Sequence, residues 1–390
     1  MQIGFTTDRD PTGTEPKIFA ECNRQAHGKW KIEPLYMPPT VDAKREQIVR
    51  RLAGKDPSLD IISLDVVLTA EFAEAGWIYD LTNRIEPIKD QFIPSTLSTV
   101  VWKNKYWALP VGANAAMLFY RTDLIKSPPK TWEDMVTQAK AVQAKTHQSG
   151  FLWQANEYEG MTVDSMEFIL AAGGQILSPD GKTALIDKGD GVLHAFQFMR
   201  SLVKDGVSPT ETLTFQEEES RQAFQQGKAP FLRNWPYVFP LANAPGSSVR
   251  GKFAATTLPG FAGHKPAGVL GGVNYAVSKY SDNPQYAWEA AQCIGSAEND
   301  KLKMIGKGEL STRKVTYDDP EVIAKVPFTK IAFDALQTAA SRPITPHYND
   351  VSYAINHVAH EVTAGNITPE QGVKELQRKV QLAIDGKGEI

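Results

Sequence analysis

The sequence predicts a mixed α/β protein with more than one domain. Its 390 residues exceed the roughly 100–200 residues of a typical single domain. Residues 1–112 alternate between short apolar runs, typical of strands, and segments whose apolar residues recur at helical spacing. The apolar run at 60–67 carries Asp65 near its end. Ligands bind at the carboxyl ends of strands in parallel sheets, so Asp65 is a candidate ligand contact, although a turn or helix-capping role is equally open.

The N-terminal part is expected to begin strand, helix, strand, helix. The strands lie over 3–6 and 32–35, and the helices include 18–22 and 48–52, with Gly54 suited to end the second helix.

Residues 106–120 are expected to cross between two parts of the chain. Aromatic residues open this segment, Pro110 and Gly112 interrupt it, and an apolar strand resumes at 115–120. Asn114 lies within the crossing.

The rest of the chain is expected to be largely helical, with some strands. Thr131 can cap a helix whose first turn is acidic, and the segments 161–172 and 193–203 are predicted to be amphipathic helices. A strand is expected at 254–258 before a glycine-rich loop, and helices dominate after about residue 320.

Two short features interrupt this later part. Gly271 and Gly272 stand inside an apolar strand, where they permit a close backbone approach or a bulge. Two prolines hold the segment 341–346 extended and can fix Arg342 in place.

The segment 231–237 combines Arg233, Trp235 and Tyr237 around a proline. Trp and Tyr offer broad apolar faces with a polar handle, and a sugar ring has apolar C–H faces ringed by hydroxyls. The segment is therefore either a packing element of the core or a platform for a sugar.

Composition and missing motifs exclude several functional classes. The net charge is −3 with both signs mixed, and no basic patch suggests nucleic-acid binding. No transmembrane stretch, signal peptide, GxGxxG, Walker A, GxSxG or HExxH pattern occurs, so no cofactor is expected. The protein is then either cytosolic or lacks its leader in this sequence. Paired carboxylates are plentiful, so counting alone leaves a glycosidase open.

The spacing of the cysteines and histidines does not predict a metal site. Cys22 and Cys293 are either two buried thiols or one long-range disulfide, which would favour an oxidising compartment. His357 and His360, with Glu361 beside them, can place both imidazoles on one helical face, but no third ligand is evident, and a solvated face is the preferred interpretation.

Nearly the whole chain resembles the extracellular solute-binding proteins of sugar ABC importers, in particular the trehalose/maltose-binding proteins. The segments that carry the resemblance are Leu64-Asp65-Val66-Val67, Ala75-Gly76-Trp77, Ala108-Leu109-Pro110-Val111, Leu118-Phe119-Tyr120-Arg121-Thr122-Asp123-Leu124, Trp132-Glu133-Asp134, Tyr158-Glu159-Gly160, Phe224-Gln225-Gln226-Gly227, Arg233-Asn234-Trp235-Pro236-Tyr237, Leu270-Gly271-Gly272 and Arg342-Pro343-Ile344.

The resemblance implies a two-lobed α/β fold of the maltose-binding-protein type, with discontinuous lobes, hinge strands and a ligand cleft. Lobe one would hold 1–112 and 262–312, and lobe two 113–261 and 313–390. Cys22 and Cys293 would then share a lobe, which allows a disulfide.

The resemblance also implies ligand contacts. Asp65 and Asn114 would bind sugar hydroxyls, Asn114 standing where some relatives carry Asp. Arg342 would reach hydroxyls through its fork of donors. The remaining implied contacts are Trp235 and Tyr237 as the platform and Gly271 and Gly272 through their backbone.

Other positions depart from the family or match it weakly. Lys44 stands where relatives carry Arg, and Val273 stands where some carry Trp, so the second sugar subsite is expected to differ. Asp10, Glu15 and Glu159 are weaker candidates, with surface or structural roles preferred.

The resulting expectation is a non-catalytic monomer outside the cytoplasm, lipid-anchored or free, that delivers a disaccharide or α-glucoside to a membrane permease. Trehalose is favoured; glycosylated glycerol or glycerate remains an alternative. A glycoside hydrolase or a polyamine or peptide binder is the rival interpretation.

Overall fold

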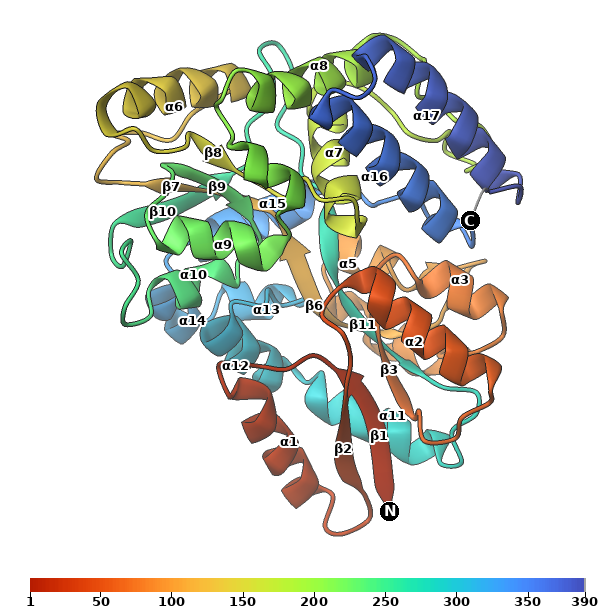
Figure 1. Ribbon diagram of the computed structural model, residues 1–390. Coiled ribbons are helices and arrows are strands. Elements are labelled where there is room, and N and C mark those ends of the chain that lie inside the picture. The colour runs from red at the N-terminus through yellow and green to blue at the C-terminus, as the bar shows by residue number, and fades with distance from the viewer. Residues whose placement is uncertain (389–390) are drawn as a thin grey trace. The chain divides into compact units, whose positions relative to one another are not determined.

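The computed structural model describes residues 1–388, which form two compact units of discontinuous chain (Figure 1). Unit 1 holds Met1–Asn114 and Leu270–Gln337. Unit 2 holds Ala115–Val269 and the chain from Thr338 onward. Each unit has its own sheet and its own hydrophobic core.

Unit 1 is built on a five-stranded sheet in the order β2-β1-β3-β11-β6. Strand β1 is parallel to β2 and β3, whereas β11 is antiparallel to β3. The carboxyl ends of β1, β2 and β3 therefore meet at one edge, together with the amino end of β11. The strands are β1 Gln2–Thr7, β2 Lys31–Tyr36, β3 Ile61–Asp65, β6 Leu109–Ala115 and β11 Leu270–Val277.

Helices α1, α11 and α12 pack together beside this sheet (Figure 1). As the spacing predicts, Ile18, Phe19 and Cys22 form the buried face of α1, and Gly54 ends α2. Cys22 forms a disulfide with Cys293, which resolves the alternative that the sequence left open. The main helices are α1 Thr14–Gln25, α2 Val41–Ala53, α11 Pro284–Ile294 and α12 Ala297–Lys307.

Shorter elements complete unit 1. They are α3 Thr69–Glu74, α4 Thr82–Ile85, the 3₁₀ helix η1 Glu86–Gln91, α5 Pro94–Ser98, the hairpin strands β4 Val101–Trp102 and β5 Lys105–Tyr106, α13 Lys314–Tyr317, α14 Pro320–Lys325 and α15 Thr329–Thr338.

Unit 2 is built on a four-stranded sheet in the order β10-β7-β9-β8. Strand β7 is antiparallel to both β10 and β9, and β8 is parallel to β9. All four residues of β9 are buried, so this strand lies in the interior of the unit. The strands are β7 Met117–Arg121, β8 Phe151–Leu152, β9 Phe231–Asn234 and β10 Phe253–Thr257.

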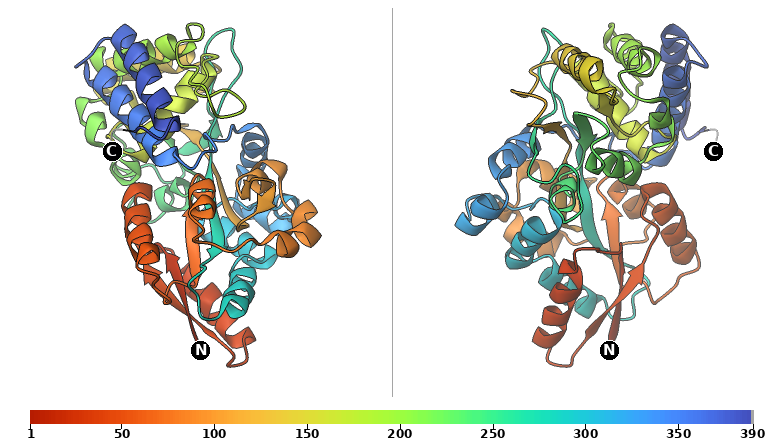
Figure 2. Two further views of the ribbon diagram at one scale, coloured as in Figure 1. Left: turned by 90° about the vertical axis from the view of Figure 1, so that its right-hand side faces the viewer. Right: turned by 60° about the vertical axis from the view of Figure 1, so that its left-hand side comes forward.

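The long helices of unit 2 pack mainly on one another, and Figure 2 shows α16 and α17 side by side. Thr131 caps α6 in a capping box with Asp134, as predicted. The helices are α6 Trp132–Thr146, α7 Glu159–Ala171, α8 Gly191–Lys204, η2 Thr210–Thr214, α9 Glu217–Gln225, α10 Val238–Ala242, α16 Tyr348–Ala364 and α17 Pro369–Ile384.

The prediction that residues 161–172 form an amphipathic helix is wrong. Every residue of α7 except Leu170 is buried, because α8 and α16 both pack against it. A helix that is buried on all sides has no solvent-facing polar side, so it is not amphipathic. The polar residues on α7 need partners inside the protein instead.

The unit boundaries differ from the expected ones at three places, the first being residues 113–114, which belong to unit 1. Residues 313–337 belong to unit 1, where Arg313 pairs with Asp300 at 2.5 Å. Residues 262–269 belong to unit 2, where the Ala262 amide donates to a Glu133 carboxylate oxygen at 3.2 Å. Sequence patterns alone do not reveal these contacts.

No helix in the described part of the chain, residues 1–388, has the length and apolar character to cross a membrane.

The disulfide should stabilise unit 1 strongly, because it closes a loop with a sequence separation of 271 residues. Replacing Cys22 and Cys293 together by Ser should lower the free energy of unfolding by about 2–5 kcal/mol. Denaturant unfolding with and without a reductant measures this. A reductant should destabilise the wild type and leave the double variant unchanged. A wild type that is insensitive to complete reduction contradicts the prediction.

Candidate functional site

Asp65 ends β3 at the carboxyl edge of the unit 1 sheet. Its Oδ1 accepts a hydrogen bond from the Val67 amide at 3.2 Å, so it shapes the turn that follows the strand. The turn-forming alternative is therefore confirmed. Asp65 is only partly buried at this edge, so its role as a ligand contact stays a prediction.

The glycine pair in β11 has a clear packing role. Gly272 has φ +132°, and a Cβ added to it would lie 2.2 Å from the carbonyl oxygen of Gly112 in β6. Its own carbonyl accepts a hydrogen bond from the Val66 amide at 3.2 Å. Glycine is thus required here for the close approach of two strands. Gly271 and Gly272 are both buried, and their backbone contact to a ligand stays a prediction.

Lys44 and Asp10 have partners within unit 1. The Lys44 ammonium is almost buried and lies 2.6 Å from the Asp8 carboxylate. Asp10 accepts hydrogen bonds from the amides of Thr12 and Glu15, each at 2.8 Å, and so orders the loop that precedes α1. Burial raises the pKa of Asp10, but these hydrogen bonds outweigh it and hold that pKa below its ordinary value.

Asn114 lies near the end of β6, one residue before the chain enters unit 2. It is partly exposed, whereas the other residues of this strand are buried. The structure therefore places Asn114 at a crossing strand, as the sequence predicts.

A buried set of charges in unit 1 escaped the sequence analysis. Lys307 pairs with Glu15 and, at 3.2 Å, with Glu309. Burial raises the pKa of Glu309, but Lys307 and Lys303 lower it below its ordinary value. The Glu309 carboxylate packs against Gly112, where an added Cβ would lie 2.6 Å from Oε1. Glu15 is thus structural, as the preferred interpretation has it.

In unit 2, Arg342 and Glu159 form a buried ion pair. Arg342 Nη1 lies 2.5 Å from Glu159 Oε1, and both side chains are at least 95% buried. The hydroxyls of Tyr348 and Ser352 also donate to this carboxylate, the first at 2.5 Å. The extended segment does fix Arg342 in place, as predicted, with a carboxylate from the start of α7.

Trp235 follows β9 and is partly buried against the core of unit 2. The guanidinium carbon of Arg233 lies 4.5 Å from the centroid of its ring, a cation–π contact. The Trp235 amide donates to Asn234 Oδ1 at 2.7 Å. The packing alternative therefore holds for the buried part of Trp235, and its role as a sugar platform stays a prediction.

Arg233 is held by four hydrogen-bonding or ionic contacts in the interior. Its Nε and Nη2 donate to both oxygens of Glu167 at 2.8 and 2.7 Å. Its Nη1 donates to Gln154 Oε1 at 2.8 Å and lies 2.8 Å from Asp164 Oδ1. Burial raises the pKa values of Asp164 and Glu167 although Arg233 opposes this. Both carboxylates belong to α7, which explains how a fully buried helix keeps acidic residues.

Tyr237 precedes α10, and its hydroxyl donates to Glu218 Oε1 at 2.7 Å. Burial, and then the nearby Glu218 carboxylate, raises the pKa of Tyr237. The phenol therefore stays protonated at neutral pH and keeps its donor.

The metal interpretation of the two histidines finds no support. His357 Nδ1 lies 2.9 Å from Glu157 Oε1, and His360 Nδ1 lies 2.8 Å from the Ala155 carbonyl. Among residues 1–388, no group of three or more His, Cys, Asp or Glu side chains is placed to hold a metal ion.

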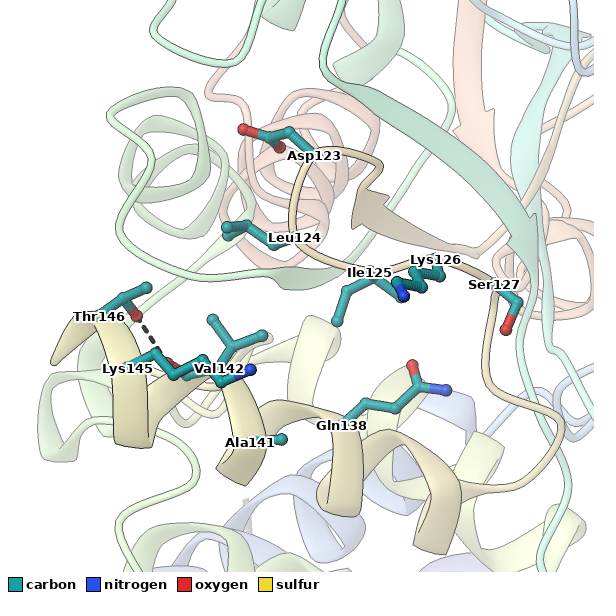
Figure 3. A pocket seen from close by; sticks show the side chains of 10 residues that line it. All are labelled: Asp123, Leu124, Ile125, Lys126, Ser127, Gln138, Ala141, Val142, Lys145 and Thr146. Carbon is teal, nitrogen blue, oxygen red and sulfur yellow. Dashed lines mark hydrogen bonds between the residues drawn. The ribbon is translucent and has the colours of Figure 1, made fainter.

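Unit 2 also carries a pocket of about 430 Å³ between the segment 123–127 and α6 (Figure 3). Leu124, Ile125 and Val142 supply apolar side chains, while Lys126 and Lys145 are exposed. No residue predicted to bind the ligand lines it. Its shape alone does not identify an occupant.

The sequence profile of the bacterial extracellular solute-binding proteins matches residues 17–330. The chain belongs to this family. A probable ABC transporter-binding protein of Deinococcus radiodurans is 31% identical over 95% of this chain and 91% of its own length.

Solved structures of solute-binding proteins also resemble this chain. T. maritima MalE3, determined with maltose bound, is 29% identical, with a TM-score of 0.91 over 98% of this chain and 99% of that one. A Thermotoga lettingae solute-binding protein with bound α-D-tagatose is 23% identical, with a TM-score of 0.89 over 98% of this chain and 99% of that one, which supports the fold alone. The predicted two-lobed α/β class is thereby confirmed.

Replacing Gly272 by Ala should destabilise unit 1. The added Cβ would meet backbone atoms of β6, and the positive φ adds strain, so we expect a loss of about 2–4 kcal/mol in unfolding free energy. Gly268→Ala is the matched control, because a Cβ there meets nothing within 4 Å. Equal denaturation midpoints for the two variants would show that the close approach is unimportant.

Replacing Glu167 by Gln should break the buried bidentate ion pair between Glu167 and Arg233. Breaking a buried pair typically costs about 3–5 kcal/mol, so a loss of that order in the free energy of unfolding is expected. Lys140→Gln removes one partner of the exposed pair with Asp205 and should leave stability nearly unchanged. Chemical denaturation distinguishes the two, and a loss of similar size in both variants would refute a special role for the buried cluster.

Proposed function

We propose that this chain is the solute-binding protein of a carbohydrate ABC importer and that it binds a disaccharide or other α-glucoside. Trehalose is the favoured ligand. The observation that carries the proposal is the partly exposed indole of Trp235, backed on the protein side by the buried Arg233 guanidinium. Maltose in T. maritima MalE3 and the family membership support the ligand class.

The indole suits a sugar because its apolar face can stack on the C–H face of a pyranose ring. Its orientation is set before the ligand arrives, since Arg233 and Asn234 hold the ring and its backbone. Tyr237, bonded to Glu218, contributes a second ring from the same segment. Such preorganisation lowers the entropy lost on binding.

The polar candidates would supply selectivity. Asp65, Asn114 and Arg342 carry an acceptor, an amide and a planar donor fork, which together complement the mixed character of sugar hydroxyls. A hydroxyl of the wrong stereochemistry would leave one of these groups without its partner, which is costly when the group is buried. We propose that backbone amides or carbonyls of Gly271 and Gly272 add further contacts.

Unit 1 carries Asp65, Asn114, Lys44 and the glycine pair, whereas Trp235, Tyr237 and Arg342 lie in unit 2. We propose that one ligand contacts residues of both units and so favours a closed arrangement by hinge motion. The closed monomer would then dock on the membrane permease.

The family and the disulfide Cys22–Cys293 support a site of action outside the cytoplasm, where the protein would be either lipid-anchored or free.

Trp235→Ala should weaken disaccharide binding by about 30-fold or more, the loss typical of a buried aromatic anchor. Isothermal calorimetry with trehalose and maltose measures this. Trp102→Ala, which alters a partly exposed Trp of unit 1, is the control and should bind normally. Arg342→Ala is less informative, because it also removes the partner of buried Glu159.

A thermal-shift screen should precede these titrations. A disaccharide present at about 100 times its dissociation constant raises the free energy of unfolding by about 2.7 kcal/mol. The melting temperature of the protein should therefore rise with ligand concentration. Glycosylglycerol and glycosylglycerate belong in the panel as alternative ligands. No shift with any sugar, or unchanged affinity in Trp235→Ala, would overturn the proposal. Release of glucose from trehalose or maltose would indicate a glycoside hydrolase instead.

A further inference from the structure

The pocket between the segment 123–127 and α6 lies wholly within unit 2 (Figure 3). Its volume of about 430 Å³ falls within the usual range for small-molecule sites. Ile125 and Val142 line it and are only 5% and 7% exposed, and both belong to the core cluster of the unit. Leu124 packs beside that cluster and is partly buried. These three side chains form an apolar floor, which would gain from contact with a hydrocarbon group.

One side of α6 contributes a polar group as well as apolar ones. The spacing i, i+3, i+4 and i+7 places on that side Gln138, Ala141, Val142 and Lys145. Figure 3 shows the Gln138 amide directed toward the segment 123–127. Gln138 Oε1 is buried and has no hydrogen-bond partner in the described part of the chain, residues 1–388. A buried acceptor without a donor is costly, so this oxygen favours a ligand that brings an O–H or N–H group.

The charged side chains of the pocket favour an anion. Lys126 comes from the segment and Lys145 from α6, and both side chains are exposed. Within residues 1–388, neither ammonium takes part in an ion pair. Asp123, the carboxylate of the lining, accepts hydrogen bonds from Arg121 Nε at 2.7 Å and from Arg121 Nη2 at 2.5 Å. The Asp123 charge is thus balanced by Arg121, and the two lysines give the pocket a positive potential.

We propose that this pocket binds a small amphipathic anion, a medium-chain hydroxycarboxylate. Its carboxylate lies between Lys126 and Lys145, its hydrocarbon chain covers the apolar floor, and its hydroxyl donates to Gln138 Oε1. An inorganic anion would leave the floor and Gln138 without partners, and a neutral apolar molecule would leave the lysines without one. The pocket belongs to one unit, so the inference is independent of the proposed sugar-binding function.

The ligand class is tested by calorimetric titration of the full chain with 3-hydroxyoctanoate, its methyl ester and octanoate. The hydroxy acid should bind. The neutral ester should bind about three- to tenfold more weakly, because it offers no charge to the two lysines. Octanoate should bind about two- to tenfold more weakly, because it leaves Gln138 Oε1 without a donor.

The place of binding is tested with two Trp variants of α6. Ala141→Trp should fill the pocket and abolish binding of the hydroxy acid, and Ala141 is an exposed position that tolerates a larger side chain. Ala144→Trp is the matched control, because Ala144 is also exposed on α6 but does not line the pocket. It should bind as the wild type does.

A third variant tests the role of the buried amide. Gln138→Met keeps the approximate size of the side chain and removes Oε1, so it should bind octanoate and 3-hydroxyoctanoate with equal affinity. Circular dichroism melting checks that every variant folds.

Three results would overturn the inference. They are no binding of 3-hydroxyoctanoate to the wild type, equal affinity for the acid and its methyl ester, and equal affinity in Ala141→Trp and Ala144→Trp. Trehalose and maltose titrated into the same proteins test the proposed function separately. Either binding activity can therefore fail while the other is retained.

Discussion

The buried guanidinium of Arg233 is the constraint on which the candidate site of unit 2 depends. A buried charge is tolerated only with partners, and Arg233 takes them from Glu167, Asp164 and Gln154. These partners come from α7 and from the chain after β8, so the ion cluster ties a helix to the sheet. The remaining face of the guanidinium meets Trp235. The orientation of the exposed indole is thus set by an electrostatic contact in the core.

Unit 1 reaches its site by different means. There the strand ends are brought together by close backbone packing, because Gly112 and Gly272 let β6 and β11 approach each other. A side chain at Gly272 would separate the strands and disturb Val66, whose amide donates to the Gly272 carbonyl next to Asp65. Gly272, one of the two glycines that resemble a ligand-binding motif, is therefore a requirement of the fold. The packing role and the proposed ligand role are compatible, because the close packing of β6 on β11 also positions the end of β3, where Asp65 lies.

The sequence predicts the parts of this structure that depend on local patterns. Helix caps such as Thr131 and strand ends such as Asp65 follow from short-range chemistry, and they appear where expected. Partners distant in the sequence are not predictable in this way. The pairing of Arg342 with Glu159 spans 183 residues, and Lys307 meets Glu15 across 292. The amphipathic prediction for α7 failed for the same reason, because its polar residues face buried partners.

Most of the charged contacts implied by the resemblance already have partners within their own unit. Lys44 is paired with Asp8, Arg342 with Glu159, and Asp10 with the amides of its loop. A ligand that contacts these groups as proposed would meet side chains whose positions are fixed, and it would gain only the hydrogen-bonding capacity that the internal contacts leave unused. Discrimination between ligands must then come chiefly from side chains that are partly or largely exposed. Asn114 and Trp235 are of this kind, the first in β6 and the second directly after β9. Ligand specificity in this chain is accordingly expected to change more readily at these two positions than at its buried charges.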